Sequence, residues 1–143
     1  VYASRGLSAL VFRGANTGLD ELTTSDANQV WIVSGGSVTP TEFDARESLG
    51  MAASSIEDLA GGEAAENAAV ARDVLSGGGA DAVRDAVALN VGAGILAWEG
   101  LENPVTQADF AERMRGAVGR ALGALADGSG ARLIDRWVAA SNA

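Results

Sequence analysis

Short apolar segments bounded by turn residues occupy the first third of the chain, and longer segments with helical spacing follow. An apolar run of about five residues between glycines is typical of a strand, whereas recurrence every 3.6 residues is typical of a helix. Strands are therefore expected at Ser8–Phe12, Gln29–Val33 and Ser37–Phe43. Gly35-Gly36 predicts a hairpin turn between the last two, and Pro40 places the returning arm at a sheet edge. The first run is apolar almost throughout, which predicts a buried, central strand.

The rest of the chain is predicted to be helical, with glycines separating one helix from the next. Helices are expected at Ile56–Ala60, Glu63–Leu75, Ala82–Glu99, Asp109–Ala126 and Ala131–Ala140. Asp81 is expected to cap the helix that it precedes. Asn90, alone among apolar residues of that helix, is predicted to be a satisfied amide that holds a loop. Gly92 and Gly94 are expected to permit close helix packing, and the tryptophans are expected in the core or on a covered domain surface.

Strands that precede helices in this way predict an α/β fold with a few-stranded mixed sheet covered by helices. About three strands for four or five helices is an unbalanced ratio for a free-standing domain, because sheets covered by helices are usually larger. The chain also begins with Val1 rather than Met. We therefore expect it to be part of a larger domain whose sheet is completed by upstream strands.

Composition narrows the chemistry that is available to the 143 residues. The chain contains no Cys, no His and no Lys, so its ten basic residues are all Arg. Disulfides, thiolate nucleophiles, histidine bases and Schiff-base lysines are thereby excluded. The net charge of -9 argues against binding to nucleic acid or to an anionic membrane. No signal peptide or apolar run long enough to span a bilayer is visible, so a cytoplasmic location is expected.

The main candidate site is an adjacent pair of acids, Asp20-Glu21, in a loop that follows the first predicted strand. In open α/β sheets, ligands bind beyond the carboxyl ends of the strands. Paired carboxylates repel each other, and a divalent cation turns that repulsion into attraction; Mg²⁺ typically takes one or two carboxylates and completes its shell with water and phosphate. Both acids can reach one ion only if the loop turns there. The alternative interpretation is an ordinary solvated acidic pair.

Three sequence blocks, the first of which contains this pair, together resemble one enzyme family. In chain order the blocks are Val11–Gly14 with Gly18–Thr24, Asp58–Glu63 with Glu66–Ala68, and Arg84–Asn90. Their order and spacing are similar to those of anthranilate phosphoribosyltransferases, and the similarity runs from about Leu7 to the C-terminus. Ordered blocks are far more specific than any one of them alone.

The resemblance implies both a fold and an activity. Residues 1–143 would be the C-terminal portion of a nucleoside phosphorylase/phosphoribosyltransferase-type large domain, without the family's N-terminal helical domain and glycine-rich phosphate loop. The family transfers a phosphoribosyl group from phosphoribosyl pyrophosphate to anthranilate in tryptophan biosynthesis. Asp20 and Glu21 would be ligands of Mg²⁺, and the isolated chain would be inactive. The family forms homodimers through the helical domain, so no dimer is expected for this chain.

One departure and two alternatives accompany the resemblance. Arg13 stands where the family usually has His, and the sequence leaves open whether it contacts a phosphate. A pyrimidine nucleoside phosphorylase relative shares the fold type, although the Gly18–Thr24 block and the short C-terminal tail favour the transferase. A non-catalytic, nucleic-acid-binding relative should carry a basic groove, against which the net charge of -9 counts.

Overall fold

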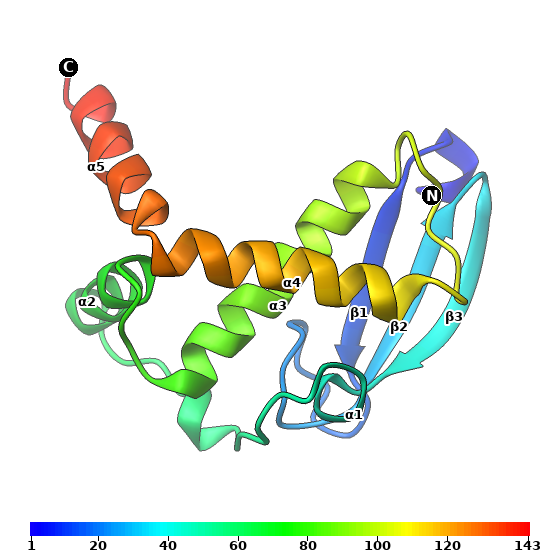
Figure 1. Ribbon diagram of the computed structural model, residues 1–143, viewed down its shortest axis with the longest axis horizontal. Helices are drawn as coiled ribbons and strands as arrows, with labels where there is room; N and C mark the ends of the chain where they lie inside the picture. The colour runs from blue at the N-terminus through cyan, green and yellow to red at the C-terminus, as the bar shows by residue number, and fades with distance from the viewer.

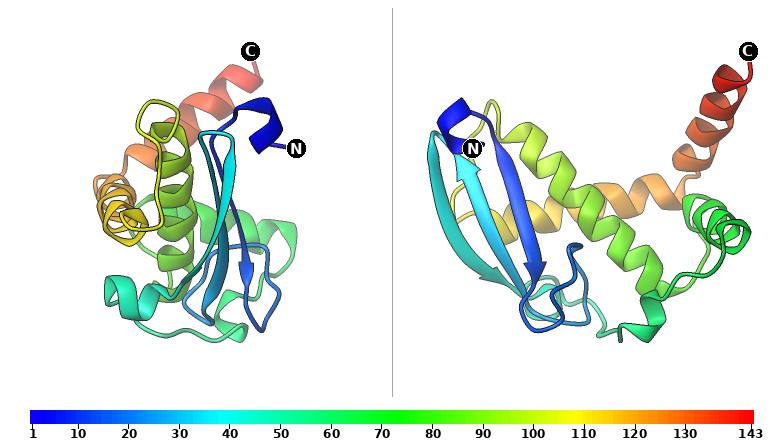
Figure 2. Two further views of the ribbon diagram at one scale, coloured as in Figure 1. Left: turned by 90° about the vertical axis from the view of Figure 1, so that its right-hand side faces the viewer. Right: turned by 180° about the vertical axis from the view of Figure 1, so that it is seen from behind.

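The computed structural model describes all 143 residues and contains a three-stranded sheet with helices packed on one face (Figures 1 and 2). The strands are β1 (Ala9–Gly14), β2 (Asn28–Ser34) and β3 (Ser37–Phe43). The helices are α1 (Ala45–Leu49), α2 (Ala64–Leu75), α3 (Asp81–Glu99), α4 (Phe110–Ala126) and α5 (Ser129–Ser141), with 3₁₀ turns η1 (Ala3–Arg5) and η2 (Glu57–Leu59). The expected α/β class is confirmed.

The sheet has the order β1-β2-β3, and both pairings are antiparallel rather than mixed. Gly35 and Gly36 have φ of 56° and 80°, which makes the predicted hairpin turn possible. Pro40 lies in edge strand β3, as predicted. The prediction of a central β1 is wrong for this chain, because β1 pairs only with β2 and Val11 is 42% exposed. An apolar run shows that a strand meets apolar surroundings, but not how many strands flank it.

The core lies between the sheet and the layer formed by α3 and α4. Its largest fully buried side chains come from the sheet, from the loop after β1 and from both helices; they include Phe43, Leu22, Ile32, Leu89, Leu96 and Met114. The rings of Phe43 and Phe110 meet edge to face, with centroids 5.3 Å apart. Gly92 lets α3 approach α4 closely, as predicted, because a Cβ there would lie 2.8 Å from Cγ2 of Val118. The same prediction is wrong for Gly94, where a Cβ would meet no atom within 4 Å. The sheet and the two long helices therefore share one core.

Helix positions follow the predictions, while some helix ends differ. The segment expected as a helix around residues 56–60 is the 3₁₀ turn η2. The short helix α1 was not predicted; Asp44 caps it by accepting a hydrogen bond from the backbone N–H of Arg46. Asp81 does not cap α3, contrary to prediction, because the cap position is Ala80 and Asp81 instead forms an ion pair with Arg84.

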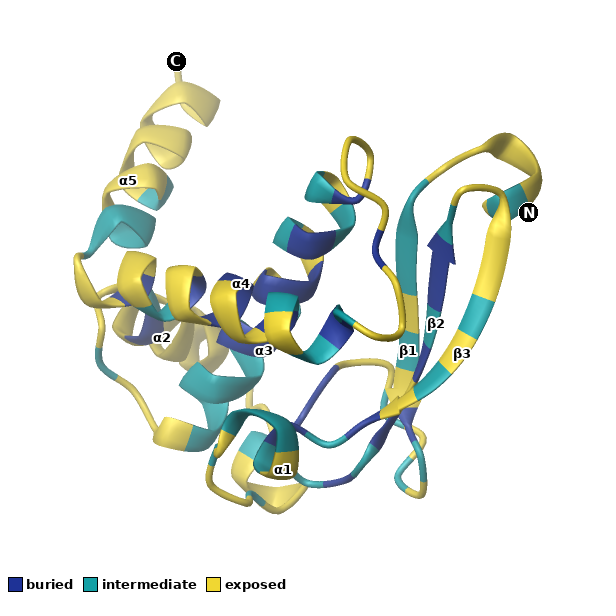
Figure 3. Cartoon of the chain, turned by 45° about the vertical axis from the view of Figure 1, so that its right-hand side comes forward, coloured by how far each residue is buried: buried dark blue, intermediate teal, exposed yellow.

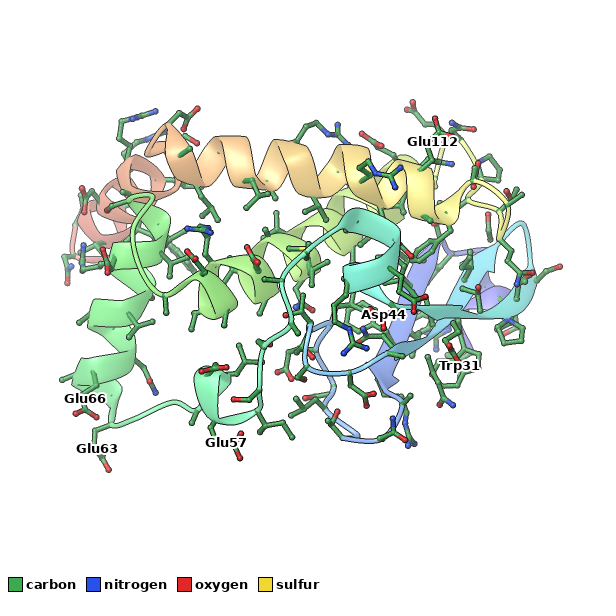
Figure 4. The ribbon with its side chains drawn as sticks, turned by 60° about the horizontal axis from the view of Figure 1, so that its bottom comes forward. Trp31, Asp44, Glu57, Glu63, Glu66 and Glu112 are labelled. Carbon is green, nitrogen blue, oxygen red and sulfur yellow. The ribbon has the colours of Figure 1, made fainter.

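Strand β3 and helix α5 are largely exposed (Figure 3), and several large apolar side chains of the chain also lie on the surface. Trp98 and Trp137 are 75% and 69% exposed, so they do not lie in the core of this chain, and the alternative of a covered domain surface stays a prediction. Trp31 is half-buried on the face of the sheet opposite α4 (Figure 4). Helix α5 extends from the body of the molecule and has no buried residue. None of the helices has the length and apolarity needed to cross a bilayer.

Candidate functional site

The predicted acidic pair lies in the loop that joins β1 to β2, residues 15–27, beside the first half of α3 (Figure 1). The backbone bends at Asp20 and Glu21, and both side chains are exposed. The next residue, Leu22, has no exposed surface and belongs to the core. The pair is therefore carried on a loop whose following segment is fixed in the protein interior.

Asp26 organises the first turn of this loop. Its carboxylate accepts hydrogen bonds from the backbone N–H of Asn16, from the backbone N–H of Thr17 at 2.9 Å and from the Asn16 side-chain amide at 2.8 Å. These bonds favour the charged form, the backbone bond from Asn16 most of all, and they lower the pKa of Asp26 to about 2. Asp26 thus stays ionised and closes the turn against the start of β2.

Two asparagines hold the segment that follows the acids. Asn90 of α3 accepts a bond from the Leu22 N–H at 3.1 Å and donates one to the Leu22 carbonyl at 2.9 Å. Asn28 of β2 pairs in the same way with Thr23, accepting at 3.4 Å and donating at 3.1 Å. The Asn28 side chain has no exposed surface, and its amide also donates to the Phe43 carbonyl. Adjacent loop residues are therefore bound to two different elements.

The two acids of the pair are not electrostatically independent. The pKa of Glu21 is raised above its ordinary value, first by a hydrogen bond with the Asp20 carboxyl, then by partial desolvation and by the charge of Asp20. Whether both carboxylates reach one cation, or one of them through water, stays a prediction. No third Asp, Glu, His or Cys joins the pair in a cluster. Two oxygen-donor carboxylates open to solvent suit Mg²⁺, which keeps water and phosphate in its shell.

A cavity of about 390 Å³ adjoins Glu21. Thr23 and Asn90 contribute polar groups to its wall, and apolar side chains, among them Leu59 and Val87, form much of the remainder. The cavity lies between the acidic loop, η2 and the first half of α3. A ligand bound there would contact a carboxylate on one side and an apolar wall on the other.

Several other charged residues and glycines lie outside the acidic loop and have structural roles or exposed positions. Arg84 pairs with Asp81 at 2.9 Å and with Asp85 at 3.8 Å, which ties the start of α3 together. Gly77–Gly79 form the linker between α2 and α3. Arg13 is exposed on β1, opposite Gln29.

Sequence reasoning missed Asp26 and Asn28. Each lies in a polar stretch of Ser, Asp and Asn that is typical of an ordinary loop, and what matters is which backbone groups it reaches. An acid and an amide immediately before a predicted strand are a weak signal for such roles, because both residues often bond to nearby backbone.

Comparison with known proteins adds to this geometry. Residues 3–131 match the model of the glycosyl transferase family, a/b domain. The chain belongs to this family. A curated anthranilate phosphoribosyltransferase of Nocardia farcinica is 45% identical over 99% of the chain and 41% of the relative. One from an Arthrobacter species is 44% identical over 97% of the chain and 38% of the relative.

A solved structure extends the family likeness to the fold. The crystal structure of anthranilate phosphoribosyltransferase from Thermus thermophilus matches with a TM-score of 0.76 and 33% identity, over 95% of this chain and 36% of that one. The resemblance found in the sequence is thereby confirmed. The chain spans about two fifths of the length of the curated relatives that it matches.

Proposed function

We propose that the protein transfers a phosphoribosyl group from phosphoribosyl pyrophosphate to the amine of anthranilate, and that this chain supplies the acidic pair Asp20-Glu21 as Mg²⁺ ligands. The observation that carries the proposal is the acidic pair itself: two adjacent, exposed carboxylates in the loop after β1, beside a cavity, in a chain of this family. The names of the relatives support the reaction, and the donor chemistry supports the metal.

The residues of this chain would act by binding and orientation. In the transfer, the bond from the anomeric carbon to pyrophosphate breaks, a bond to the anthranilate nitrogen forms, and that nitrogen loses a proton. The anomeric carbon becomes oxocarbenium-like, so no protein nucleophile is required, and a chain without Cys, His or Lys is compatible with the reaction. Bound Mg²⁺ would stabilise the charge that develops on the leaving pyrophosphate.

The surrounding loop gives the acids their position before any substrate arrives. Asp26, Asn28 and Asn90 hold the backbone on both sides of the pair through hydrogen bonds from three directions. A loop that is already ordered loses less conformational entropy on binding a ligand than a mobile one. The cavity beside Glu21 keeps one side of the pair accessible.

The first prediction tests the acidic pair in the full-length protein. We expect Asp20→Asn combined with Glu21→Gln to reduce transferase activity at least about 10-fold and to raise the Mg²⁺ concentration needed for half-maximal rate, since loss of even an indirect metal contact costs about 10–100-fold. The measurement is the initial rate of phosphoribosyl transfer as a function of MgCl₂. Mg²⁺ activation that is the same in the double variant and the parent would refute the metal assignment.

A matched control separates the metal role from a general change of charge. Glu102→Gln combined with Glu112→Gln removes two exposed acids as well, but these lie in the loop before α4 and at the start of α4 (Figure 4). We expect this control to keep the Mg²⁺ dependence of the parent. Phosphate-dependent cleavage of a pyrimidine nucleoside, measured on the same preparation, would favour the phosphorylase alternative instead.

A further inference from the structure

The side chain of Asn90 is joined to the acidic loop by a two-point contact. Its Oδ1 accepts from the Leu22 N–H, and its Nδ2 donates to the Leu22 carbonyl and to the Ala86 carbonyl at 2.8 Å. The amide thereby satisfies both backbone groups of the residue that follows Glu21. One amide with an acceptor and two donors cannot be replaced by an apolar or singly bonding side chain without leaving a backbone group unpaired.

Helix stability does not explain the presence of Asn90. Asn is a poor residue for a helix interior, and α3 is otherwise largely apolar around this position. Its bond to the Ala86 carbonyl lies within the helix, but the other two bonds reach a residue 68 positions earlier in the chain. The side chain therefore serves the loop rather than the helix.

We infer that Asn90 is a positioning residue for the Asp20-Glu21 pair: its two-point contact with Leu22 orients the carboxylates toward a shared divalent cation. The inference rests on the proposed function. Asn90 also lines the cavity beside Glu21, so the same side chain borders the space in which the cation and its phosphate ligand would meet. It acts through the backbone of Leu22 and need not touch the metal.

The chain contains a natural control for this contact. Asn67 of α2 forms the same two-point contact with Gly62, accepting from its N–H at 2.9 Å and donating to its carbonyl at 2.8 Å. That contact lies in the loop between η2 and α2, outside the loop that carries the acids. Asn67→Leu and Asn90→Leu thus remove the same bonds to backbone, but only Asn90→Leu removes them beside the acidic pair.

The test uses the full-length protein and Mn²⁺ alone as the probe, with binding measured by calorimetry. We expect Asn90→Leu to weaken Mn²⁺ binding about 10-fold or more, as loss of an orienting contact typically does, and Asn67→Leu to leave it unchanged. Asn90→Ser is the milder variant. Its hydroxyl can still bond to the Ala86 carbonyl but cannot pair with Leu22, so it should weaken binding even if Asn90→Leu does not fold. Hydrogen exchange should accelerate at the Leu22 amide in both Asn90 variants.

A double-mutant cycle decides whether Asn90 acts through the acids. In the Asp20→Asn, Glu21→Gln background, Asn90→Ser should have no further effect on Mn²⁺ affinity. The inference is overturned if the acid substitutions weaken binding while the Asn90 variants bind Mn²⁺ as the parent does, or if Asn67→Leu weakens it equally. If the acid substitutions themselves leave Mn²⁺ binding unchanged, the proposed metal site fails first and the role of Asn90 fails with it.

Discussion

At the scale of single residues, Asp26 stabilises the turn after β1 through hydrogen bonds to its backbone. It is 7% exposed, accepts hydrogen bonds from two successive backbone N–H groups, and has a pKa lowered to about 2. A group whose pKa is lower in the folded state stabilises the fold above its unfolded pKa, here near 3.8, and loses that contribution as the pH falls toward 2. The shift corresponds to about 2 kcal/mol.

The prediction at this scale concerns acid stability. Asp26→Asn should lower the free energy of unfolding at pH 7 by about 1–3 kcal/mol, because an amide group replaces a carboxylate oxygen that accepts bonds. The variant should also lose part of the decline in stability that the parent shows between about pH 4 and pH 2. Urea unfolding measured across this pH range checks both effects. Parallel pH profiles for variant and parent would contradict the assigned role.

Some of the contacts around the acidic loop could be predicted from the types of residue in the sequence, and others could not. The sequence alone identified Asp20-Glu21 as a candidate pair and Asn90 as an amide that holds a loop, because each stands out from its neighbours. The structure confirms that Asn90 holds a loop, and the metal role of the acidic pair stays a prediction. Asp26 and Asn28 could not be assigned, because their partners are backbone groups whose positions depend on how the loop folds.

At the scale of elements, the packing of α3 on α4 depends on Gly92. The nearest atoms to a Cβ at that position include the backbone nitrogen of Val118 at 3.1 Å, so a side chain there would force the helices apart. A Cβ at Gly94, two residues later on the same helix, would meet no atom within 4 Å.

Substituting alanine for these two glycines is therefore expected to change the stability of the protein in opposite directions. Gly92→Ala should destabilise the protein by about 1–3 kcal/mol through overpacking. Gly94→Ala should stabilise it by about 0.5–1 kcal/mol, since alanine has the higher helix propensity and meets no obstacle. Thermal unfolding of the two variants, measured side by side, gives the comparison. Equal effects would mean that helix propensity, not close packing, governs position 92.

Elements with a strong periodic pattern were predictable, and short or context-dependent ones were not. The hairpin at Gly35-Gly36 and the long helices follow from local pattern and turn chemistry. Helix α1 has five residues and depends on its Asp44 cap, so it has no periodic signal. The edge position of β1 depends on which strands pair with it, and that information is not local. For Trp98 the sequence left both the core and a covered surface open, because an apolar side chain does not reveal which side of its helix is covered.

At the scale of the whole molecule, burial is uneven. The face of the sheet away from α3 and α4 exposes part of the row Val11, Trp31 and Pro40, which are paired across the three strands. Helix α5 lies at the far end of the molecule and is joined to α2 by an exposed Arg72–Asp135 ion pair of 3.3 Å. Exposed ion pairs contribute little to stability.

We therefore expect α5 to be the least protected helix. Its backbone amides should exchange with solvent much faster than those of α3, whose inner face is part of the core. Residue-resolved hydrogen exchange at neutral pH measures the difference. Protection of α5 equal to that of α3 would indicate that the helix is held by more than the contacts described above.

The pairing of Leu22 with α3 and of Thr23 with β2 has a mechanical consequence. One peptide bond joins a residue bound to the helix layer to a residue bound to the sheet. If the two layers slide against each other, the strain falls on this bond, one residue beyond Glu21. The position of the backbone that directly follows the acids thus depends on how the helices pack on the sheet.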